Sequence, residues 1–208
     1  MMRIALTQRV EFQKHLNETR DSIDQRWTKV LDSLGHIPIL VPNNLRHTVE
    51  WIEAAGVEGL ILTGGNDVGN LTDIGSQFGT RDLTEKLLLD WASKNTIPVI
   101  GICRGLQMIN VFLGGKLRKI QDHVNVRHTL TTEKNDRLFG RFSSVNSYHN
   151  FGIHEQDLSN QLLPKAWSGN LIEAASHSTL PWIGLMWHPE RENELKHTDK
   201  NIFLELFR

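Results

Sequence analysis

The chain has 208 residues, a formal net charge of −1, and 39% hydrophobic and 23% charged residues. These values are ordinary for a globular domain with a sizeable core, and they argue against non-specific nucleic-acid binding, which needs a strongly basic face. No apolar run is long enough to span a bilayer, and the first residues have no signal-peptide pattern. Because one cysteine cannot form an intramolecular disulfide, we expect a cytoplasmic protein. From the charge and the lack of a long apolar run we expect no nucleic-acid or membrane partner.

Short apolar runs alternate with helical patterns along the first half of the chain. In order, the predicted elements are a strand at Arg3–Thr7, a helix at Ser22–Leu34, a strand at Ile37–Val41, a helix at Thr48–Ala55, a strand at Val57–Leu62, a helix at Leu83–Ser93, a strand at Val99–Ile102 and a helix at Arg104–Leu113. The second half is less regular, with short strands predicted near Phe142–Asn146, Leu171–Ala174 and Ile183–Met186. This order predicts one α/β domain over residues 1–208, with an open, mostly parallel sheet, helices on both faces and a site at the carboxyl ends of the strands.

Cys103 lies at the predicted junction of a strand and a helix, with Gly101 and Gly105 two residues to either side. A tight strand-to-helix turn presents a nucleophile to solvent, and the N–H groups of the following helix favour a thiolate over a thiol. A lone cysteine is more often a small buried hydrophobe. The seven-residue pattern G-x-C-x-G-x-Q, which ends at Gln107, favours the nucleophile here.

A cysteine nucleophile needs a base, and His188 is the best placed of the ten histidines. It follows the apolar run Ile183–Trp187 and so comes just after a predicted strand. Glu190 is two residues further on, and residues i and i+2 of an extended backbone project to the same side. The Glu190 carboxylate can therefore orient the His188 imidazole as a general base.

Five segments together resemble the class I glutamine amidotransferase-like fold, and within it the γ-glutamyl hydrolases of the peptidase C26 group. The matching segments are Leu62–Asp67, Gly101–Gln107, Val145–His149, Ile172–Ala174 and Trp187–Glu190. They occur in the family's order, and the resemblance covers nearly the whole chain. The resemblance implies a flavodoxin-like sheet and a cysteine-dependent amide hydrolase.

By that resemblance Cys103, His188 and Glu190 form a catalytic triad. The backbone N–H groups of Gly65 and Arg104 would then form the oxyanion hole that stabilises the tetrahedral intermediate. Gln107 would help to hold the glutamyl group, although a polar side chain on an apolar helix can equally serve a structural hydrogen bond. Asn146, Ser147, Tyr148 and His149 match the hydrolase form of their loop and are expected to bind substrate.

The segment from Lys116 to Arg141 carries seven lysines and arginines against three acidic residues. A basic rim beside the nucleophile's helix, with Arg127 and His128 in it, would favour a leaving amine that bears phosphate or carboxylate groups. A solvated loop explains the same composition. Substrates known in the family include γ-glutamyl-aminobutyrate, poly-γ-glutamyl folates and the γ-glutamyl-CDP-amidate of capsule phosphoramidate synthesis, and the basic segment favours the last.

The sequence therefore predicts a γ-glutamyl amide hydrolase that works through a glutamyl-thioester intermediate on a small-molecule substrate. The main alternative is a glutaminase subunit that delivers ammonia to a partner synthetase, and a third is a non-catalytic cysteine protein of related fold. His123, His128 and His149 match no compact metal-ligand spacing, and the thiol mechanism needs no metal or other cofactor, so none is expected. The sequence leaves open whether the chain forms a homo-oligomer.

Overall fold

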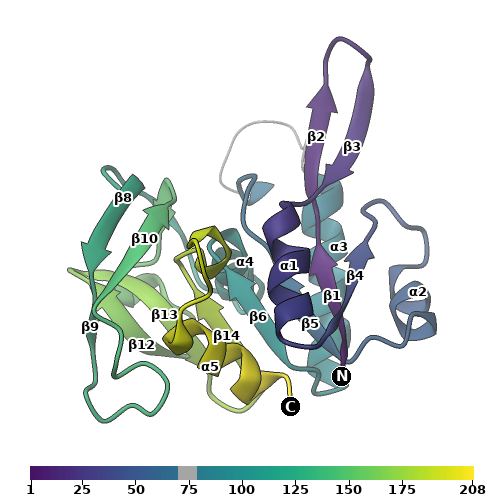
Figure 1. Cartoon of the computed structure of the whole chain (residues 1–208). Coiled ribbons are helices and arrows are strands. Elements are labelled where there is room, and N and C mark those ends of the chain that lie inside the picture. Colours follow the sequence, from purple (N-terminus) through teal and green to yellow (C-terminus); the bar gives the residue numbers. More distant parts are fainter. Residues whose placement is uncertain (70–78) are drawn as a thin grey trace.

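One eight-stranded sheet runs through the computed structural model, which describes residues 1–69 and 79–208 (Figure 1). Its first five strands in spatial order pair in parallel, and the last three add on antiparallel. In that order the strands are β4 (Ile37–Val41), β1 (Arg3–Thr7), β5 (Gly59–Leu62), β6 (Val99–Ile102), β14 (Trp182–Leu185), β13 (Leu171–His177), β12 (Leu162–Ser168) and β9 (Thr131–Thr132). The sequence prediction of an open, mostly parallel sheet is confirmed.

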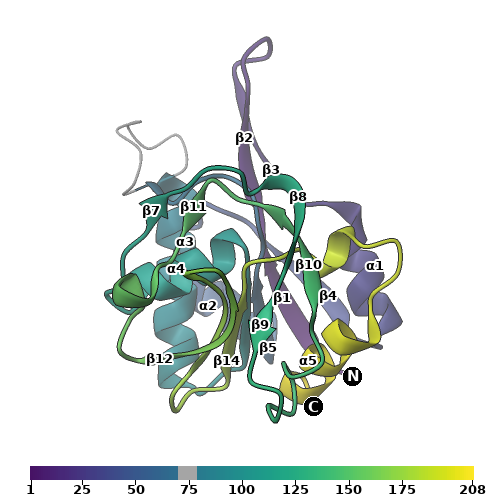
Figure 2. The same cartoon turned by 90° about the vertical axis from the view of Figure 1, so that its left-hand side faces the viewer.

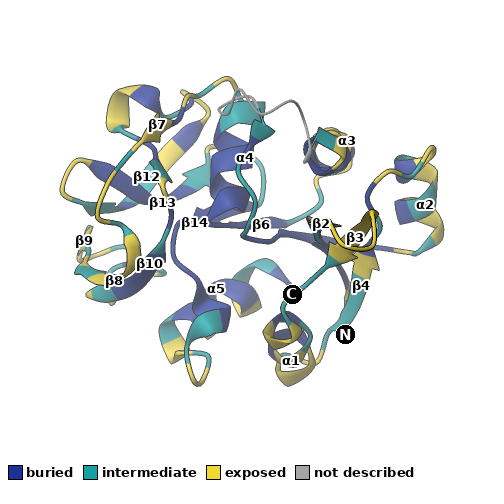
Figure 3. Cartoon of the chain, turned by 90° about the horizontal axis from the view of Figure 1, so that it is seen from above, coloured by how far each residue is buried: buried dark blue, intermediate teal, exposed yellow. Residues whose placement is uncertain are grey.

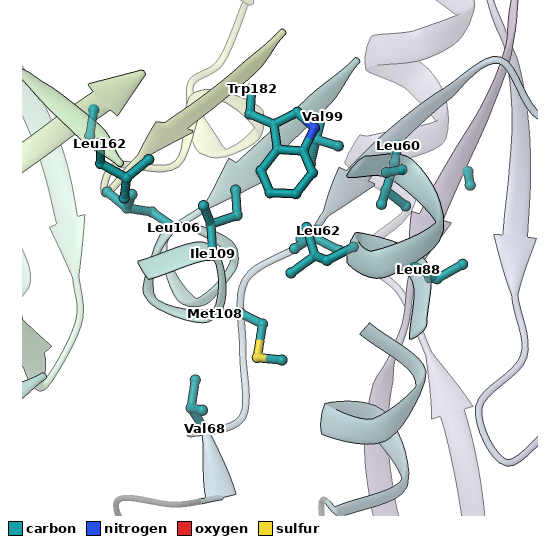
Figure 4. Packing of buried hydrophobic residues seen from close by; sticks show 14 of the residues in the cluster. Leu60, Leu62, Val68, Leu88, Val99, Leu106, Met108, Ile109, Leu162 and Trp182 are labelled. Atoms are coloured by element: carbon teal, nitrogen blue, oxygen red, sulfur yellow. The ribbon is translucent and has the colours of Figure 1, made fainter. Parts of the chain in front are cut away.

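Helices cover both faces of this sheet, as predicted (Figure 3). One face packs against α2 (Thr48–Ala54), α3 (Gly79–Lys94) and α4 (Arg104–Phe112), and the other against α1 (Gln25–Ser33) and α5 (His197–Leu206). Each face has its own hydrophobic cluster. In the first, Leu106 and Ile109 of α4 lie against Leu62, Val99 and Trp182 (Figure 4). The described residues thus form a single α/β domain with a core on either side of the sheet.

Three small two-stranded sheets stand apart from the main one. They pair β2 (Arg9–Gln13) with β3 (Glu18–Ser22), β8 (Val124–Thr129) with β10 (Ser144–Tyr148), and β7 (Arg118–Lys119) with β11 (Phe151–Gly152). The β2–β3 hairpin projects well beyond the rest of the molecule (Figure 1, Figure 2). Two short 3-10 helices, Glu155–Asp157 and Pro189–Arg191, complete the described elements.

Most predicted elements occur within a few residues of their expected bounds, and the strands at Arg3–Thr7, Ile37–Val41 and Val99–Ile102 match fully. The predicted helix at Ser22–Leu34 begins too early, because Ser22 ends β3 and the Asp24 side chain caps the helix by accepting from the N–H of Arg26. The β2–β3 hairpin, β7, β8, β9, β11, β12 and α5 were not predicted.

The parallel pairing decides where functional residues meet. β5, β6 and β14 are neighbours that run in the same direction, with Leu62 opposite Gly101 and Ile102 opposite Leu185. Their carboxyl ends therefore bring three segments of the chain to one edge of the sheet. None of the described helices is both long and apolar enough to cross a membrane.

Candidate active site

Cys103 occupies a strained turn between β6 and α4. Its backbone has φ +52° and ψ −102°, a conformation that side-chain-bearing residues rarely adopt and that costs about 1–3 kcal/mol. The turn is held by a 2.6 Å hydrogen bond from the N–H of Cys103 to the carbonyl oxygen of Leu185 in β14. A Cβ added to Gly105 would lie 2.2 Å from the carbonyl oxygen of Leu62, so only glycine lets α4 approach β5 this closely. The predicted strand-to-helix elbow is present, and its strain is the kind that concentrates at functional sites.

His188 and Glu190 lie just beyond the end of β14, beside this turn. The Nδ1 atom of His188 is 2.7 Å from Oε1 of Glu190, and both side chains are almost fully buried. The imidazole rests directly on Gly64, because a Cβ there would lie 2.5 Å from its Cε1 atom. Since Nδ1 donates to the carboxylate, Nε2 is the ring nitrogen left to exchange a proton.

The charge around His188 favours its protonated form. Burial alone would lower the pKa of the imidazole, but negative charge on Cys103 and on Glu190 outweighs burial and raises that pKa to about 9. The site therefore places the Cys103 sulfur beside an imidazole that is protonated near neutral pH. This pairing supplies both a nucleophile and a proton for a leaving group.

The backbone N–H groups of Gly65 and Arg104 belong to two loops on either side of Cys103. Gly65 has φ +84° in the loop after β5, and Arg104 is the first residue of α4. In the described part of the chain neither N–H donates to a protein acceptor. Both residues line the same pocket as Cys103, so this arrangement suits a developing oxyanion.

Arg81 of α3 fixes the Gly65 loop in place, and sequence analysis missed it. Its guanidinium is fully buried and donates to the carbonyl oxygens of Thr63 at 2.6 Å and Gly65 at 2.7 Å. It also pairs with Glu85 at 2.9 Å, and Glu85 in turn pairs with Arg104. Burial, and then repulsion from Arg104, lowers the pKa of Arg81 to about 10. This network ties the Gly65 loop to the side chain of Arg104.

The network on α3 has a second acidic member, Asp82. Its carboxylate pairs with the Arg104 guanidinium and accepts from the N–H of Gly69 at 2.7 Å. Arg81 and Glu85 are four residues apart on one helix, and that spacing is the only signal in the sequence. Such pairs usually lie in solvent, so spacing alone could not show that this one is buried.

The pocket above Cys103 has a volume of about 310 Å³. Its lining residues are Arg9, Gly65, Asn66, Asp67, Cys103, Arg104, Gln107, Tyr148, His149, Asn150, His188 and Arg191. Arg9 comes from the unpredicted hairpin, and its side chain lies against Gly65, where an added Cβ would be 2.3 Å from its Nε atom. The Arg191 guanidinium stacks 4.3 Å from the ring centroid of Tyr148. These two guanidinium groups line the pocket together with Arg104, whose charge is paired with Asp82 and Glu85, and with the carboxylate of Asp67.

The expected substrate-binding residues separate into two groups. Gln107, Tyr148 and His149 line the pocket. The Nε2 atom of Gln107 donates to the carbonyl oxygen of Phe151 at 2.9 Å. This amide nitrogen therefore makes the structural hydrogen bond that was the alternative to substrate binding. The Tyr148 ring lies edge-on to the imidazole of His188, with 5.7 Å between centroids.

Asn146 and Ser147 hold backbone segments in place. Asn146 accepts from the N–H of His188 and donates to its carbonyl oxygen, both at 2.8 Å. Ser147 is fully buried and donates to the carbonyl oxygen of His123 at 2.7 Å. Asn146 thus holds the backbone of His188 in place, whereas Ser147 holds the backbone at His123.

Arg127 and His128 are outside the pocket lining. Arg127 pairs with Glu192 at 2.7 Å and donates to the carbonyl oxygen of Ser144. His128 packs toward Glu173 of β13, where burial raises the pKa of the carboxyl to about 8. In the basic segment from Lys116 to Arg141, Arg118, Arg127 and Arg137 each pair with an acidic residue elsewhere in the chain. In the described part of the chain, Arg127 and His128 therefore do not form the basic rim of the pocket that the sequence predicted.

The family model for peptidase C26 matches residues 4–190. The chain belongs to the peptidase C26 family. The γ-glutamyl-CDP-amidate hydrolase of Campylobacter jejuni is 31% identical over 205 residues, which cover 94% of either chain. A subunit of the glutamine-hydrolysing GMP synthase of Picrophilus torridus is 26% identical over 171 residues, covering 81% of this chain and 84% of that one.

Solved structures show the same fold. A glutamine amidotransferase of Thermotoga maritima superposes with a TM-score of 0.68 at 15% identity, covering 98% of this chain and 83% of the other. The predicted family and fold are thereby confirmed. Membership in peptidase C26 and the relatives together support a hydrolase with glutamine amidotransferase-like chemistry on γ-glutamyl amides.

Proposed function

We propose that this peptidase C26 protein hydrolyses a γ-glutamyl amide through a glutamyl-thioester on Cys103. The observation that carries the proposal is the strained cysteine turn sharing a pocket with the buried His188–Glu190 pair. The sulfur attacks the γ-carbonyl carbon, the C–N bond breaks, and protonated His188 gives its proton to the departing amine. Neutral His188 then takes a proton from water, whose oxygen attacks the thioester and releases glutamate and the thiolate.

Two backbone donors would stabilise the tetrahedral intermediates of both steps. The N–H groups of Gly65 and Arg104 line the pocket beside Cys103, and preorganised donors of this kind contribute about 3–4 kcal/mol each to lowering the barrier. The Arg81 network keeps the two loops at a fixed separation, so the donors need no rearrangement during the reaction. The Gln107 side chain would contribute one wall of the glutamyl pocket.

We further propose that the leaving amine is anionic. Arg9 and Arg191 present guanidinium groups to the pocket, and guanidinium binds phosphate and carboxylate in a bidentate manner. The Campylobacter jejuni relative is named for a substrate whose leaving part carries a diphosphate. A γ-glutamyl nucleotide amidate therefore fits this site better than a γ-glutamyl amide with a neutral leaving group. A reactive thiol also needs a reducing compartment, which favours the cytoplasm.

A panel of γ-glutamyl amides with nucleotide, carboxylate and neutral leaving groups tests both proposals through released glutamate. We expect release by the wild-type chain and none by Cys103→Ala; release that persists in the mutant refutes the thioester. Arg9→Gln and Arg191→Gln should raise KM for anionic amides about 10- to 100-fold and leave neutral amides nearly unchanged. Arg127→Gln is the matched control, because Arg127 pairs with Glu192 outside the pocket lining.

A glutaminase subunit is the second candidate, favoured by the relationship to the Picrophilus torridus GMP synthase component. Such a glutaminase would hydrolyse free glutamine weakly by itself and strongly in the presence of a synthetase. The same panel distinguishes the two functions. Efficient release of glutamate from an anionic γ-glutamyl amide by the isolated chain supports the hydrolase, whereas inertness on every amide and activation by a synthetase supports the glutaminase.

A further inference from the structure

A cluster of three histidines and a glutamate lies between the small β8–β10 sheet and the main sheet. His123 precedes β8, His128 is in β8, His149 follows β10, and Glu173 is in β13. One candidate ligand atom from each of the four lies within 4.8 Å of all the others. The four residues come from three separate segments that only the fold brings together. Sequence spacing could not group them, because it identifies only ligands that lie on one local element.

The glutamate of the cluster is buried without a partner. Glu173 has no exposed surface, and neither of its carboxylate oxygens has a hydrogen-bond donor in the part of the chain that the structure describes. The Nε2 atom of His128 lies 3.7 Å from one of these oxygens and Nε2 of His149 lies 3.7 Å from the other, which is too long for a hydrogen bond. A carboxyl group buried without a donor is costly to ionise, so its charged form needs a cation to compensate it.

The orientation of His149 shows what kind of group is missing. Its Nδ1 atom is 2.9 Å from the carbonyl oxygen of Phe151, so Nδ1 carries the proton and donates there. Nε2 is then an acceptor, and it points at the Glu173 carboxylate, which is also an acceptor. With the carboxylate ionised, these two acceptors need a positive centre between them, and their separation of 3.7 Å is too long for a shared proton. A histidine that donates from one ring nitrogen to a backbone carbonyl and offers the other is the usual arrangement of a metal ligand.

The other two histidines complete the set. Both ring nitrogens of His128 are buried and unpartnered among the described residues, as is Nδ1 of His123. The rings of His128 and His149 each lie 5.1 Å from that of His123, centroid to centroid. Four ligands around a tetrahedral zinc ion, with bonds of about 2.0–2.2 Å, stand about 3.3–3.6 Å apart. The 3.7 Å separations at Glu173 are close to that requirement, and small side-chain rotations would meet it.

We propose that His123, His128, His149 and Glu173 bind a structural zinc ion. Three imidazoles and one carboxylate suit zinc rather than calcium or magnesium, which prefer all-oxygen sites. Four protein ligands leave no open position, as in structural zinc sites, so the ion takes no part in the thiol chemistry. It would tie the β8–β10 wall of the pocket to β13 of the main sheet. The inference is independent of the proposed substrate.

Metal content measured on the purified, untagged chain tests this site. The chain is exposed to equimolar zinc and desalted, and zinc is counted by mass spectrometry. We expect about one zinc ion per wild-type chain, and at least a fivefold loss in His128→Ala and in Glu173→Gln. His47→Ala removes an exposed histidine and should retain the ion. All variants carry Cys103→Ser, so that the active-site thiol cannot account for bound zinc.

A cobalt measurement covers variants that fold poorly. Chelator-treated protein reloaded with Co²⁺ should show the intense visible absorption of tetrahedral cobalt, and His123→Ala, a less buried position, should lose it while keeping its far-UV circular dichroism. Chelation should lower the Tm of the chain and leave that of His123→Ala unchanged. A wild-type chain that stays metal-free, or ligand variants that keep full zinc and cobalt binding, would overturn the proposal.

Discussion

The sheet side of the pocket and the wall opposite it are held by different kinds of contact. On the sheet side, β5, β6 and α4 approach so closely that Gly105 has no room for a Cβ, and the buried Arg81–Glu85 pair locks the loop after β5. The wall from β8 and β10 is held by single side chains that reach distant segments, such as Asn146 to His188. The proposed catalytic groups thus stand on closely packed backbone, whereas the wall depends on long-range polar contacts.

The largest effect is expected at the strained turn on the sheet side. Cys103→Gly should reduce glutamate release on the order of 10⁴-fold or more, because the nucleophile is lost. Glycine also tolerates φ +52°, so the free energy of unfolding should rise by about 1 kcal/mol in urea denaturation. Cys103→Ala is the matched control, inactive yet still strained. Equal stability of the two variants would show that the turn stores no strain.

The pH dependence of kcat/KM tests His188, the proposed general base. Because the folded-state pKa of His188 is raised to about 9, the proton for the leaving amine is present below that pH, and kcat/KM should fall as pH rises through 9. Glu190→Gln removes one cause of the raised pKa, so it should lower kcat/KM on the order of 10³-fold and move this alkaline limb down by about one pH unit. An unmoved limb would assign the titration to another group.

The same shift has a consequence for stability. A raised folded-state pKa means that the contribution of His188 to stability is fully present below its unfolded value, about 6.5, and is lost as pH rises through 9. Tm measured between about pH 6 and 10 should therefore decline on the alkaline side. The decline should be shallower in Glu190→Gln.

Replacing Arg81 tests whether its buried guanidinium holds the loop after β5, which carries Gly65. Arg81→Met removes one of the two buried arginine partners of Glu85 and the donor to the carbonyl oxygens of Thr63 and Gly65. We therefore expect a loss of about 1–3 kcal/mol in the free energy of unfolding, and about 10²-fold in kcat from misplaced N–H donors. Arg81→Lys should fail to restore kcat, because an ammonium cannot reach Thr63 and Gly65 together. Arg20→Met breaks an exposed pair with Glu18 and should change stability by less than about 0.5 kcal/mol. Full activity in Arg81→Lys would contradict the positioning role.

The sequence predicted the sheet side well because its signals are local. Cys103 and its two flanking glycines lie within five residues, and His188 and Glu190 are two residues apart, so short-range patterns were sufficient. The strands and helices of the first half follow from hydrophobic periodicity, which depends only on neighbouring residues.

The long-range contacts of the wall, and the approach of Arg9 to the pocket, could not be predicted because they join segments far apart in the sequence. Tyr148 and His149, which were expected in the site, do line the pocket. Arg9 reaches the pocket from a hairpin whose second strand, Glu18–Ser22, is almost entirely exposed and has no apolar alternation. Arg127 carries the charge expected of a substrate ligand, yet it pairs with Glu192, 65 residues away. A charge count finds a basic segment, but only the fold decides which charges are neutralised and which face the pocket.

Asn146 of the wall is hydrogen-bonded to the backbone of His188, so it connects the two sides. Its replacement is expected to have the smallest effect on activity. Asn146→Ala would remove both hydrogen bonds to the His188 backbone, leaving its buried N–H unpaired at a cost of about 1–3 kcal/mol, while its carbonyl oxygen keeps the N–H of Arg191. Because Asn146 positions the base without lining the pocket, kcat should fall about tenfold while KM stays nearly constant. Asn135→Ala, at an exposed position, should leave both constants unchanged. A rise in KM with unchanged kcat would instead make Asn146 a substrate ligand, and the wall would then bind substrate rather than support the base.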